Sequence, residues 1–187
     1  MNVYETLPEL VGENYLLREV RESDADDLLK VYSDEKSVPL FNDDNCHGDD
    51  FHYTTAERMK EAISFWRYSY EHGYFVRWAV VEKQSGRAVG TVELFHRDSD
   101  SDYFDNCGLL RLDLKSDCER ANIIKEILSL LKDCTFDWFY CDKIATKIKP
   151  FAEERKKAAE ALGFELCEDP LVGNDGQKYF DYYVLKN

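Results

Sequence analysis

The chain has 187 residues, of which 44% are hydrophobic and 14% aromatic, enough for one substantial core and too apolar for a disordered chain. Its 38 acidic and 24 basic residues give a net charge of -14, spread along the chain. Nucleic acid and anionic membranes are therefore excluded as expected partners, because binding phosphate takes clustered cations. A field of this sign favours cationic substrates such as amines, or it only keeps the surface soluble. We expect one domain over residues 1–187.

The N-terminus and the cysteines indicate the compartment. Residues 1–10 carry acidic residues and a proline, where a signal peptide would have a basic start and an apolar run. The six cysteines form no Cys-x-x-Cys pair and no zinc-ligand spacing with the four histidines, which favours free thiols in a reducing compartment. The sequence therefore predicts a cytoplasmic protein without a metal site.

The first part of the chain combines a strand with two helices. Residues 15–20 read as a strand, and apolar residues at helical spacing predict helices over residues 25–32 and 54–73. Thr54 is the expected N-cap of the second helix. The polar segment over residues 37–53 between the helices is a long loop, and such loops are often functional.

Three strands are expected next. Two runs over residues 75–82 and 88–96 are rich in β-branched and aromatic residues and predict a hairpin. Over residues 108–114, leucines alternate with Arg111 and Asp113, which is the period of a strand with two different faces.

The last part of the chain adds two helices and three strands. The clearest helical stripe is capped by Ser116 or Asp117 and continues to Cys134. A strand over residues 144–148, a helix from Pro150 to a left-handed cap at Gly163, a strand over residues 164–167 and a final hairpin strand over residues 179–185 follow. This order predicts a mixed sheet covered by helices on both faces.

The order of elements resembles the GCN5-related N-acetyltransferase (GNAT) family over nearly the whole chain. The resemblance is carried by Tyr15-Leu16-Leu17-Arg18 with Ser23-Asp24-Ala25-Asp26 near the start, by Val89-Gly90 in the hairpin, and by Ala161-Leu162-Gly163-Phe164 near the end. Within the family it looks closest to the ribosomal-protein-alanine and spermidine acetyltransferase branch. The resemblance implies an α/β (α+β) fold with a mixed, mostly antiparallel, twisted sheet and helices on both faces.

The resemblance also implies a site for acetyl-CoA. In the family the sheet opens into a wedge, here between Leu110–Leu114 and Ile144–Ile148. Backbone groups of Leu112 and Leu114 would hold the pantetheine arm and polarise the thioester carbonyl. The pyrophosphate would lie at the start of the next helix, where unpaired amides and the helix dipole favour an anion. The residues implied there are Ser116, Arg120, Asn122 and Ile123.

The phosphate loop departs from the family pattern. The family pattern is Gln or Arg, then two residues, Gly, one residue, and Gly or Ala. Its three key positions align with Glu119, Asn122 and Ile124, and all three differ. Ile124 adds bulk if it points toward the ligand, and the carboxylates of Asp117 and Glu119 could occupy the place of the anion. The alternative is an ordinary acidic helix start, stabilised by the helix dipole.

The general acid of the family is also missing. The family often has Asn, Ser and Tyr in the downstream helix, where this chain has Ala152, Arg155 and Ala159. Tyr140, Cys141 or water could protonate the departing thiolate instead.

A base is expected because amine attack needs a neutral nucleophile. Glu93 and Asp113, on strands that line the implied cleft, are the candidates; the alternative is that each is a solvated strand carboxylate. His96 could relay a proton, or it is a structural or exposed histidine.

Two functions follow from these observations. The first is transfer of acetyl from acetyl-CoA to a primary amine of a small molecule or peptide, with the acidic loops at 43–50 and 98–105 either recruiting a cationic acceptor or simply solvated. The alternative is a GNAT-fold binding or regulatory module that has lost acetyl-CoA and uses its cleft or aromatics such as Trp66 and Tyr68. An acyl-CoA user with another acyl chain is a third reading. Free amides over residues 116–122 would favour the enzyme.

Overall fold

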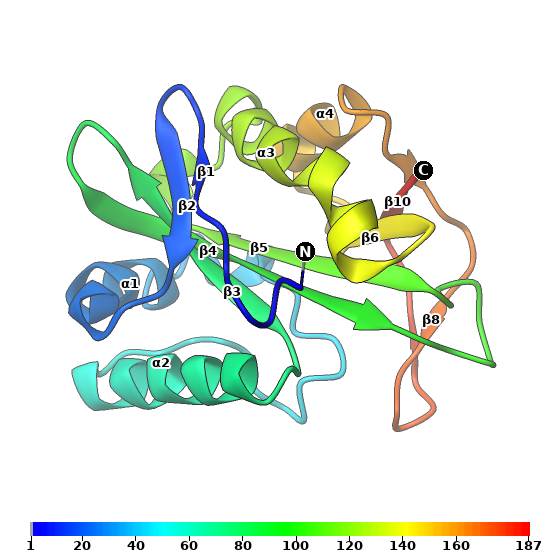
Figure 1. Cartoon of the computed structure of the whole chain (residues 1–187), viewed down its shortest axis with the longest axis horizontal. Coiled ribbons are helices and arrows are strands. Elements are labelled where there is room, and N and C mark those ends of the chain that lie inside the picture. The colour runs from blue at the N-terminus through cyan, green and yellow to red at the C-terminus, as the bar shows by residue number, and fades with distance from the viewer. Residues whose placement is uncertain (1) are drawn as a thin grey trace.

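The computed structural model describes residues 2–187, in which one large sheet separates two layers of helices (Figure 1). The strands are β1 (Leu10–Val11), β2 (Tyr15–Glu19), β3 (Val76–Glu82), β4 (Arg87–Arg97), β5 (Cys107–Leu114), β6 (Lys143–Lys147), β7 (Glu165–Leu166), β8 (Leu171–Val172), β9 (Lys178–Tyr179) and β10 (Tyr182–Lys186). The helices are α1 (Ala25–Tyr32), α2 (Ala56–Glu71), α3 (Ala121–Phe139) and α4 (Glu153–Glu160). Three 3-10 turns lie at Glu22–Asp24, Val38–Leu40 and Ser116–Cys118.

The large sheet has eight strands in the order β1-β2-β3-β4-β5-β6-β10-β7, and β8 and β9 form a separate two-stranded sheet. The pair β5–β6 is parallel, and the other neighbouring strands run antiparallel. The mixed, mostly antiparallel sheet predicted from the sequence is therefore confirmed.

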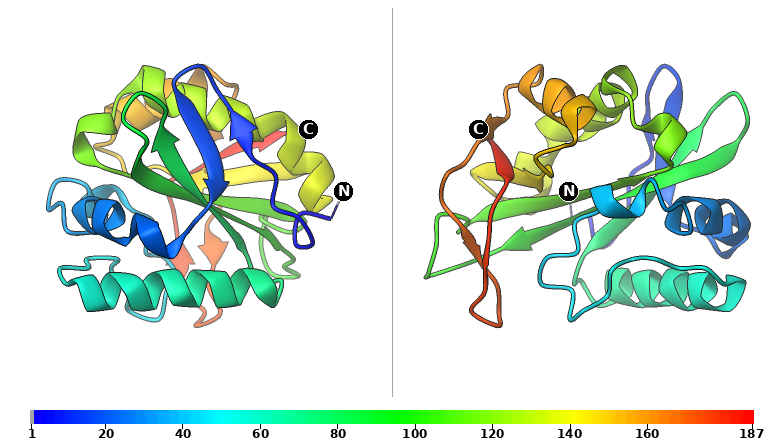
Figure 2. Two further views of the ribbon diagram at one scale, coloured as in Figure 1. Left: turned by 60° about the vertical axis from the view of Figure 1, so that its left-hand side comes forward. Right: turned by 180° about the vertical axis from the view of Figure 1, so that it is seen from behind.

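Helices α1 and α2 cover one face of the sheet, and α3 and α4 cover the other (Figures 1 and 2). Successive residues of a strand point to opposite faces, and β3 shows the result. Trp78 and Val80 are buried in the cluster that includes the apolar stripe of α3. Ala79 and Val81 are buried in the cluster formed with α1 and α2. The sheet is thus packed on both faces, as its long apolar runs indicate.

Two helix starts differ from the sequence-based expectation. Helix α3 begins at Ala121 and not at a cap on Ser116 or Asp117, because a separate 3-10 turn occupies Ser116–Cys118. Helix α2 is capped by Thr55, whose hydroxyl accepts a hydrogen bond from the amide of Arg58 at 3.2 Å, so the prediction of Thr54 as N-cap was wrong by one residue. The correction at α2 concerns two adjacent threonines of similar capping ability, whereas α3 starts after Arg120, which makes no side-chain cap hydrogen bond.

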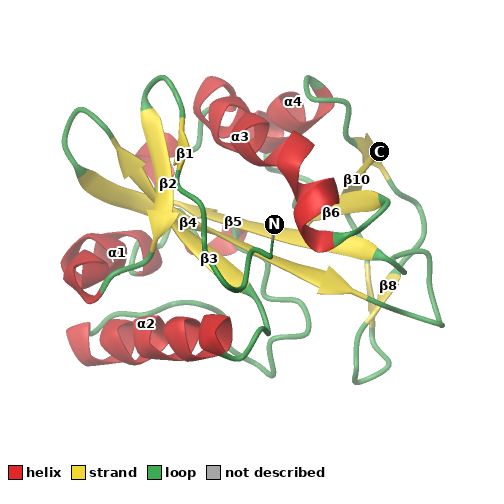
Figure 3. Cartoon of the chain, in the orientation of Figure 1, coloured by secondary structure: helices red, strands yellow, loops and turns green. Residues whose placement is uncertain are grey.

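The C-terminal strands also differ (Figure 3). The predicted final strand over residues 179–185 is divided between β9, which pairs with β8, and β10, which pairs with β6 and β7. Asp181 separates them with a positive φ of 68°. The two-residue strand β1, which pairs with β2, was not predicted because two residues carry no periodicity. The left-handed cap at Gly163, with φ of 90°, agrees with the prediction.

Three global features bear on function. All six cysteines are free thiols in the described chain. Within residues 2–187, no group of three or more His, Cys, Asp and Glu residues is arranged to hold a metal ion. No helix in the same range combines the length and apolar character needed to cross a membrane.

Candidate active site

Strands β5 and β6 run side by side over only part of their length. Their pairing begins at Cys107 with Lys143 and ends at Leu110 with Thr146. Strand β5 stays paired with β4 on its other side as far as Leu114. The last residues of β5 therefore leave β6 and border a gap in the sheet, at the position where the resemblance places the wedge.

Leu112 and Leu114 turn their backbone groups toward this gap. The amide of Lys115 donates to the carbonyl of Val89 at 2.9 Å, and backbone groups along an antiparallel strand point alternately toward and away from the partner. Leu112 and Leu114 therefore present their N–H and C=O on the side away from β4. Their side chains are buried in the apolar cluster under α3. These two leucines offer a ligand their backbone rather than their side chains.

Four amides of the turn between β5 and α3 are engaged within the protein. The amide of Ser116 donates to the carboxylate of Asp34 at 3.1 Å. The turn itself uses three further amides, those of Cys118, Glu119 and Arg120, which donate to carbonyls two or three residues earlier. An anion arriving at Ser116 would have to displace a carboxylate from a different part of the chain.

The first turn of α3 is more open. The amide of Ala121 donates to the carboxylate of Glu154 at 2.9 Å. The amides of Asn122 and Ile123 have no acceptor among residues 2–187, and regular helical bonding begins with Ile124, which donates to the carbonyl of Arg120. The Glu154 side chain is 45% exposed, so it can rotate into solvent. Three successive helix-start amides would then be available to an anion.

A buried ion pair joins this turn to α4. Nε of Arg155 donates to the carboxylate of Glu119 at 3.0 Å, and its Nη1 donates to the carbonyl of Leu40 at 3.0 Å. The Arg155 and Glu119 side chains are both buried. Both positions are ones at which the sequence departs from the family pattern. In the structure the two departures form one contact of complementary charge.

Of the residues expected to block the anion, Asp117 stays at the turn beside Arg120 and Ile123, whereas Ile124 turns into the core. Asp117 is exposed and pairs with Lys115 at 2.6 Å. Ile124 is buried in the core under α3 and does not face a ligand. The carboxylates that engage the amides belong instead to Asp34 and Glu154, which no local sequence pattern predicted. Acetyl-CoA, the donor that the family implies, thus fits the strand side of the site, and fits the helix start only once Glu154 moves away.

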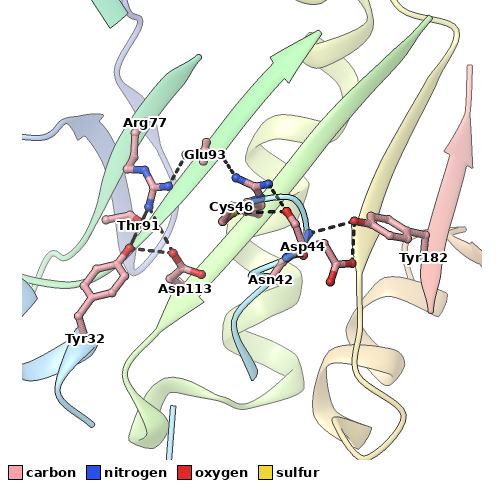
Figure 4. Close-up of polar contacts among 10 residues, drawn as sticks. Tyr32, Asn42, Asp44, Cys46, Arg77, Thr91, Glu93, Asp113 and Tyr182 are labelled. Atoms are coloured by element: carbon pink, nitrogen blue, oxygen red, sulfur yellow. Dashed lines mark hydrogen bonds and ion pairs between the residues drawn. The ribbon is translucent and has the colours of Figure 1, made fainter. Parts of the chain in front are cut away.

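The opposite face of β4 and β5 carries a buried polar network (Figure 4). Nη1 of Arg77 donates to the Tyr32 hydroxyl at 2.9 Å and to the Thr91 hydroxyl at 3.0 Å, and its Nη2 donates to Glu93. The carboxylate of Asp113 accepts from the Tyr32 hydroxyl at 2.8 Å and lies 3.3 Å from Nη1 of Arg77. Buried charges are tolerated when they are paired and hydrogen-bonded in this way.

Arg111 extends the network to the loop after α1. Its Nη1 donates to Glu93 at 2.8 Å, and its Nη2 donates to the carbonyl of Asp44 at 3.0 Å. The Asp44 carboxylate accepts from Nζ of Lys147 on β6 at 2.6 Å and from the Tyr182 hydroxyl on β10 at 3.1 Å. The loop is therefore fastened to strands on both sides of the β5–β6 gap.

The two candidate bases differ in electrostatic environment. Burial would raise the pKa of Glu93, but Arg77 and Arg111 outweigh it and hold that pKa below its usual range. Burial raises the pKa of Asp113 above its usual range, although Arg77 and Tyr32 oppose the shift. Glu93 is therefore a weak proton acceptor in this arrangement, and Asp113 is the more basic carboxylate of the two.

The other predicted groups lie away from the gap. Tyr140 is 77% exposed and directly follows α3, at the end of the helix opposite the turn between β5 and α3. The 19 residues of α3 span roughly 28 Å at 1.5 Å per residue. His96 lies near the same end, with Nδ1 2.6 Å from the carbonyl of Phe139. Cys141 is buried, and burial raises the pKa of its thiol. The structure does not bring these groups together with Glu93 and Asp113.

A cavity of about 370 Å³ borders the network on the side of α2. Its floor includes Arg77, Glu93 and Arg111, and Cys46 from the loop lies beside them. Arg77 was not predicted as a site residue, although one signal marks it: it is the single charged residue in the apolar run from Phe75 to Val81. A charge at such a position indicates a buried partner.

Comparison with protein families matches residues 14–165 to the acetyltransferase (GNAT) domain. A search of curated proteins found no match. Many solved structures share the fold. Ribosomal-protein-S5-alanine acetyltransferase from Vibrio fischeri has 20% identity and a TM-score of 0.67, covering 95% of this chain and 94% of that one.

Two further structures illustrate the range of neighbours. Mycobacterium smegmatis RimJ in complex with CoA-disulfide has 17% identity and a TM-score of 0.68, covering 95% of this chain and 83% of that one. A GNAT-family acetyltransferase from Bacillus anthracis has 12% identity and a TM-score of 0.68, covering 96% of this chain and 98% of that one. The neighbours include ribosomal-protein acetyltransferases, as the resemblance predicted. With most of its length matched by the family and its sheet diverging between β5 and β6, the chain belongs to the GNAT acetyltransferase family.

Proposed function

We propose that this chain transfers an acetyl group from acetyl-CoA to a primary amine of a small molecule or peptide. The observation that carries the proposal is the divergence of β5 from β6 after Leu110 and Thr146. It leaves the backbone of Leu112 and Leu114 facing the gap, where amides can align a carbonyl and stabilise the charge that develops on its oxygen. Backbone groups supply this function, so it survives the loss of consensus side chains.

The charged residues beside the gap take different roles in this proposal. Asp113, with its raised pKa, is the candidate base that keeps the attacking amine neutral. Glu93 positions Arg77 and Arg111. Tyr140 has no part in the reaction because it lies at the far end of α3. Ala121, Asn122 and Ile123 are the amides that would meet the donor's phosphates.

A second candidate function is a binding or regulatory module that does not use acetyl-CoA. Two contacts favour it: the carboxylate of Asp34 on the amide of Ser116, and the buried Glu119–Arg155 pair beside the same turn. Each places the protein's own charge where the family would hold phosphate.

Calorimetric titration with acetyl-CoA at low salt, with CoA as a control, separates the two functions. We expect micromolar binding by the wild-type chain. In the variant Glu154→Ala the amide of Ala121 loses its acceptor and the site loses a negative charge, so acetyl-CoA affinity should rise about two- to fivefold, the size of a charge effect at a helix terminus. Glu153→Ala is the matched control, because Glu153 lies on the same turn of α4 and pairs with Lys156 instead.

The outcomes assign the function clearly. If both the wild-type chain and Glu154→Ala show no heat and no thermal stabilisation at millimolar acetyl-CoA, the acetyltransferase proposal fails and the module stands. If Glu153→Ala strengthens binding as much as Glu154→Ala, the contact at Ala121 is not what restricts the donor.

A further inference from the structure

The cavity beside the polar network is walled by aromatic rings. It lies between α2, the loop after α1 and strands β3 to β5. Its aromatic residues are Phe51, Tyr53, Phe65, Trp66 and Phe75. A volume of about 370 Å³ is at the small end of the range of ligand sites. The size and the walls suit a single small ring-bearing molecule.

Arg77 in the floor of this cavity lacks one hydrogen-bond acceptor. Its side chain is only 2% exposed. Both Nη atoms donate within the network, whereas Nε has no partner among residues 2–187. A guanidinium has five N–H donors and no acceptor, and a buried donor without a partner is costly. Because Arg77 lines the adjoining cavity, a ligand held there is the candidate acceptor for this donor.

The charges at the floor select an anionic oxygen. The charged residues that line the cavity are three arginines and two carboxylates, namely Arg58, Arg77, Arg111, Asp49 and Glu93. Cys46 adds no charge, because burial raises the pKa of its thiol to about 11. The floor is thus locally cationic although the whole chain carries a net charge of -14. A carboxylate is attracted to two guanidinium groups, and a polyamine is repelled by them.

The rings are placed next to the guanidinium. The carbon at the centre of the Arg77 guanidinium lies 4.2 Å from the ring centre of Trp66 and 5.8 Å from that of Phe75. Phe65, which is 58% exposed, packs edge-on against Phe75 with centroids 6.0 Å apart. A ligand ring entering past Phe65 would find aromatic partners while its acidic group is near Arg77.

We propose that this cavity binds a small ligand that combines an aromatic ring with a carboxylate, one oxygen of which accepts a hydrogen bond from Nε of Arg77. The binding itself does not depend on acetyl transfer. Its extension to the acceptor of the reaction rests on the proposed function: it makes aromatic α-amino acids, rather than polyamines, the amines that the chain acetylates.

Titration of the full chain with three probes tests the chemistry. The probes are 3-phenylpropanoate, which has both groups, phenethylamine, which has the ring without the carboxylate, and propanoate, which has the carboxylate without the ring. Calorimetry should show saturable binding of 3-phenylpropanoate, with each of the other two at least about tenfold weaker. Phenethylamine binding as tightly as 3-phenylpropanoate, or no heat from 3-phenylpropanoate at millimolar concentration, would overturn the proposal.

Variants on α2 place the ligand in this cavity. Ala62 lines it and is buried, so Ala62→Leu should fill the space and abolish binding of 3-phenylpropanoate. Ala56→Leu is the control, at the start of the same helix and outside the lining. If Ala62→Leu does not fold cooperatively, Phe65→Ala is used in its place, because Phe65 is largely exposed. The variant Phe65→Ala should weaken binding of 3-phenylpropanoate about tenfold. Wild-type affinity in the folded cavity variant contradicts the assignment.

An activity assay separates this inference from the proposed function. Acetyl-CoA turnover should be faster with L-phenylalanine than with spermidine. Binding of 3-phenylpropanoate without turnover of any amine removes the proposed function and leaves the cavity assignment intact. Turnover with spermidine but not with L-phenylalanine, together with no binding of 3-phenylpropanoate, removes the cavity assignment and leaves the acetyltransferase.

Discussion

The two faces of β5 border interiors of opposite character. On one face Leu110, Leu112 and Leu114 pack in the apolar cluster under α3. On the other, Arg111 and Asp113 join a network of charges and hydroxyls under α1 and α2. One strand of eight residues therefore separates a region stabilised by close apolar packing from a region stabilised by ion pairs and hydrogen bonds between particular side chains.

The difference shows which face carries function. Apolar packing stabilises a fold directly, whereas a buried ion pair often contributes no more than a well-packed apolar pair would. A cluster of buried charges next to a cavity is therefore better explained by a site than by stability. Removing one buried side chain should therefore lower the free energy of unfolding more on the polar face than on the apolar face.

The largest effect is expected at Arg77. The variant Arg77→Met leaves Glu93 and Asp113 buried without their main cation, and breaking a buried pair in this way costs about 3–5 kcal/mol in the free energy of unfolding. Urea denaturation measures the change. Arg67→Met is the control, because Arg67 forms an exposed pair with Glu22, and its loss should stay below about 1 kcal/mol. Equal losses in the two variants would mean that the network is not needed for stability.

The apolar face should respond somewhat less. Leu114→Ala removes a fully buried side chain, and such truncations cost about 2–5 kcal/mol depending on how far the cavity collapses. Because Leu114 faces the gap through its backbone, the folded variant should keep the wild-type affinity for acetyl-CoA. Calorimetry on the folded variant checks this. A tenfold loss of affinity at unchanged fold would show that the side chain itself shapes the donor site.

The smallest change in stability is expected for Asp34, whose carboxylate contacts the turn between β5 and α3. Burial opposes the shift, but hydrogen bonds from Ser116, Lys36 and Ser37 lower the pKa of Asp34 to about 2. A lowered folded-state pKa contributes stability that is present above the unfolded value near 3.8 and is lost as the pH falls toward 2. Asp34→Asn should therefore be less stable than the wild type by about 1 kcal/mol at neutral pH, after allowance for solvent screening. Denaturation at a series of pH values should show the difference shrinking below pH 4, and a constant difference would contradict the contact.

Elements with many residues in one pattern were predicted well. The helical stripe of α3 and the alternation in β5 indicated both elements, although α3 begins and ends later than predicted. The short strands β1 and β9 were missed or merged, because two residues cannot display a period. Within the site, Glu93 and Asp113 were singled out as carboxylates on strands, and the structure shows that both face Arg77.

Local patterns in the sequence were sufficient to establish the layered fold, the family and the departure of the phosphate loop from its consensus. Packing alone decided what those departures mean. The carboxylates that engage Ser116 and Ala121 come from Asp34, 82 residues away, and Glu154, 33 residues away. A polar side chain finds a distant partner only after the elements that carry the two residues have packed together, and no local period records that contact.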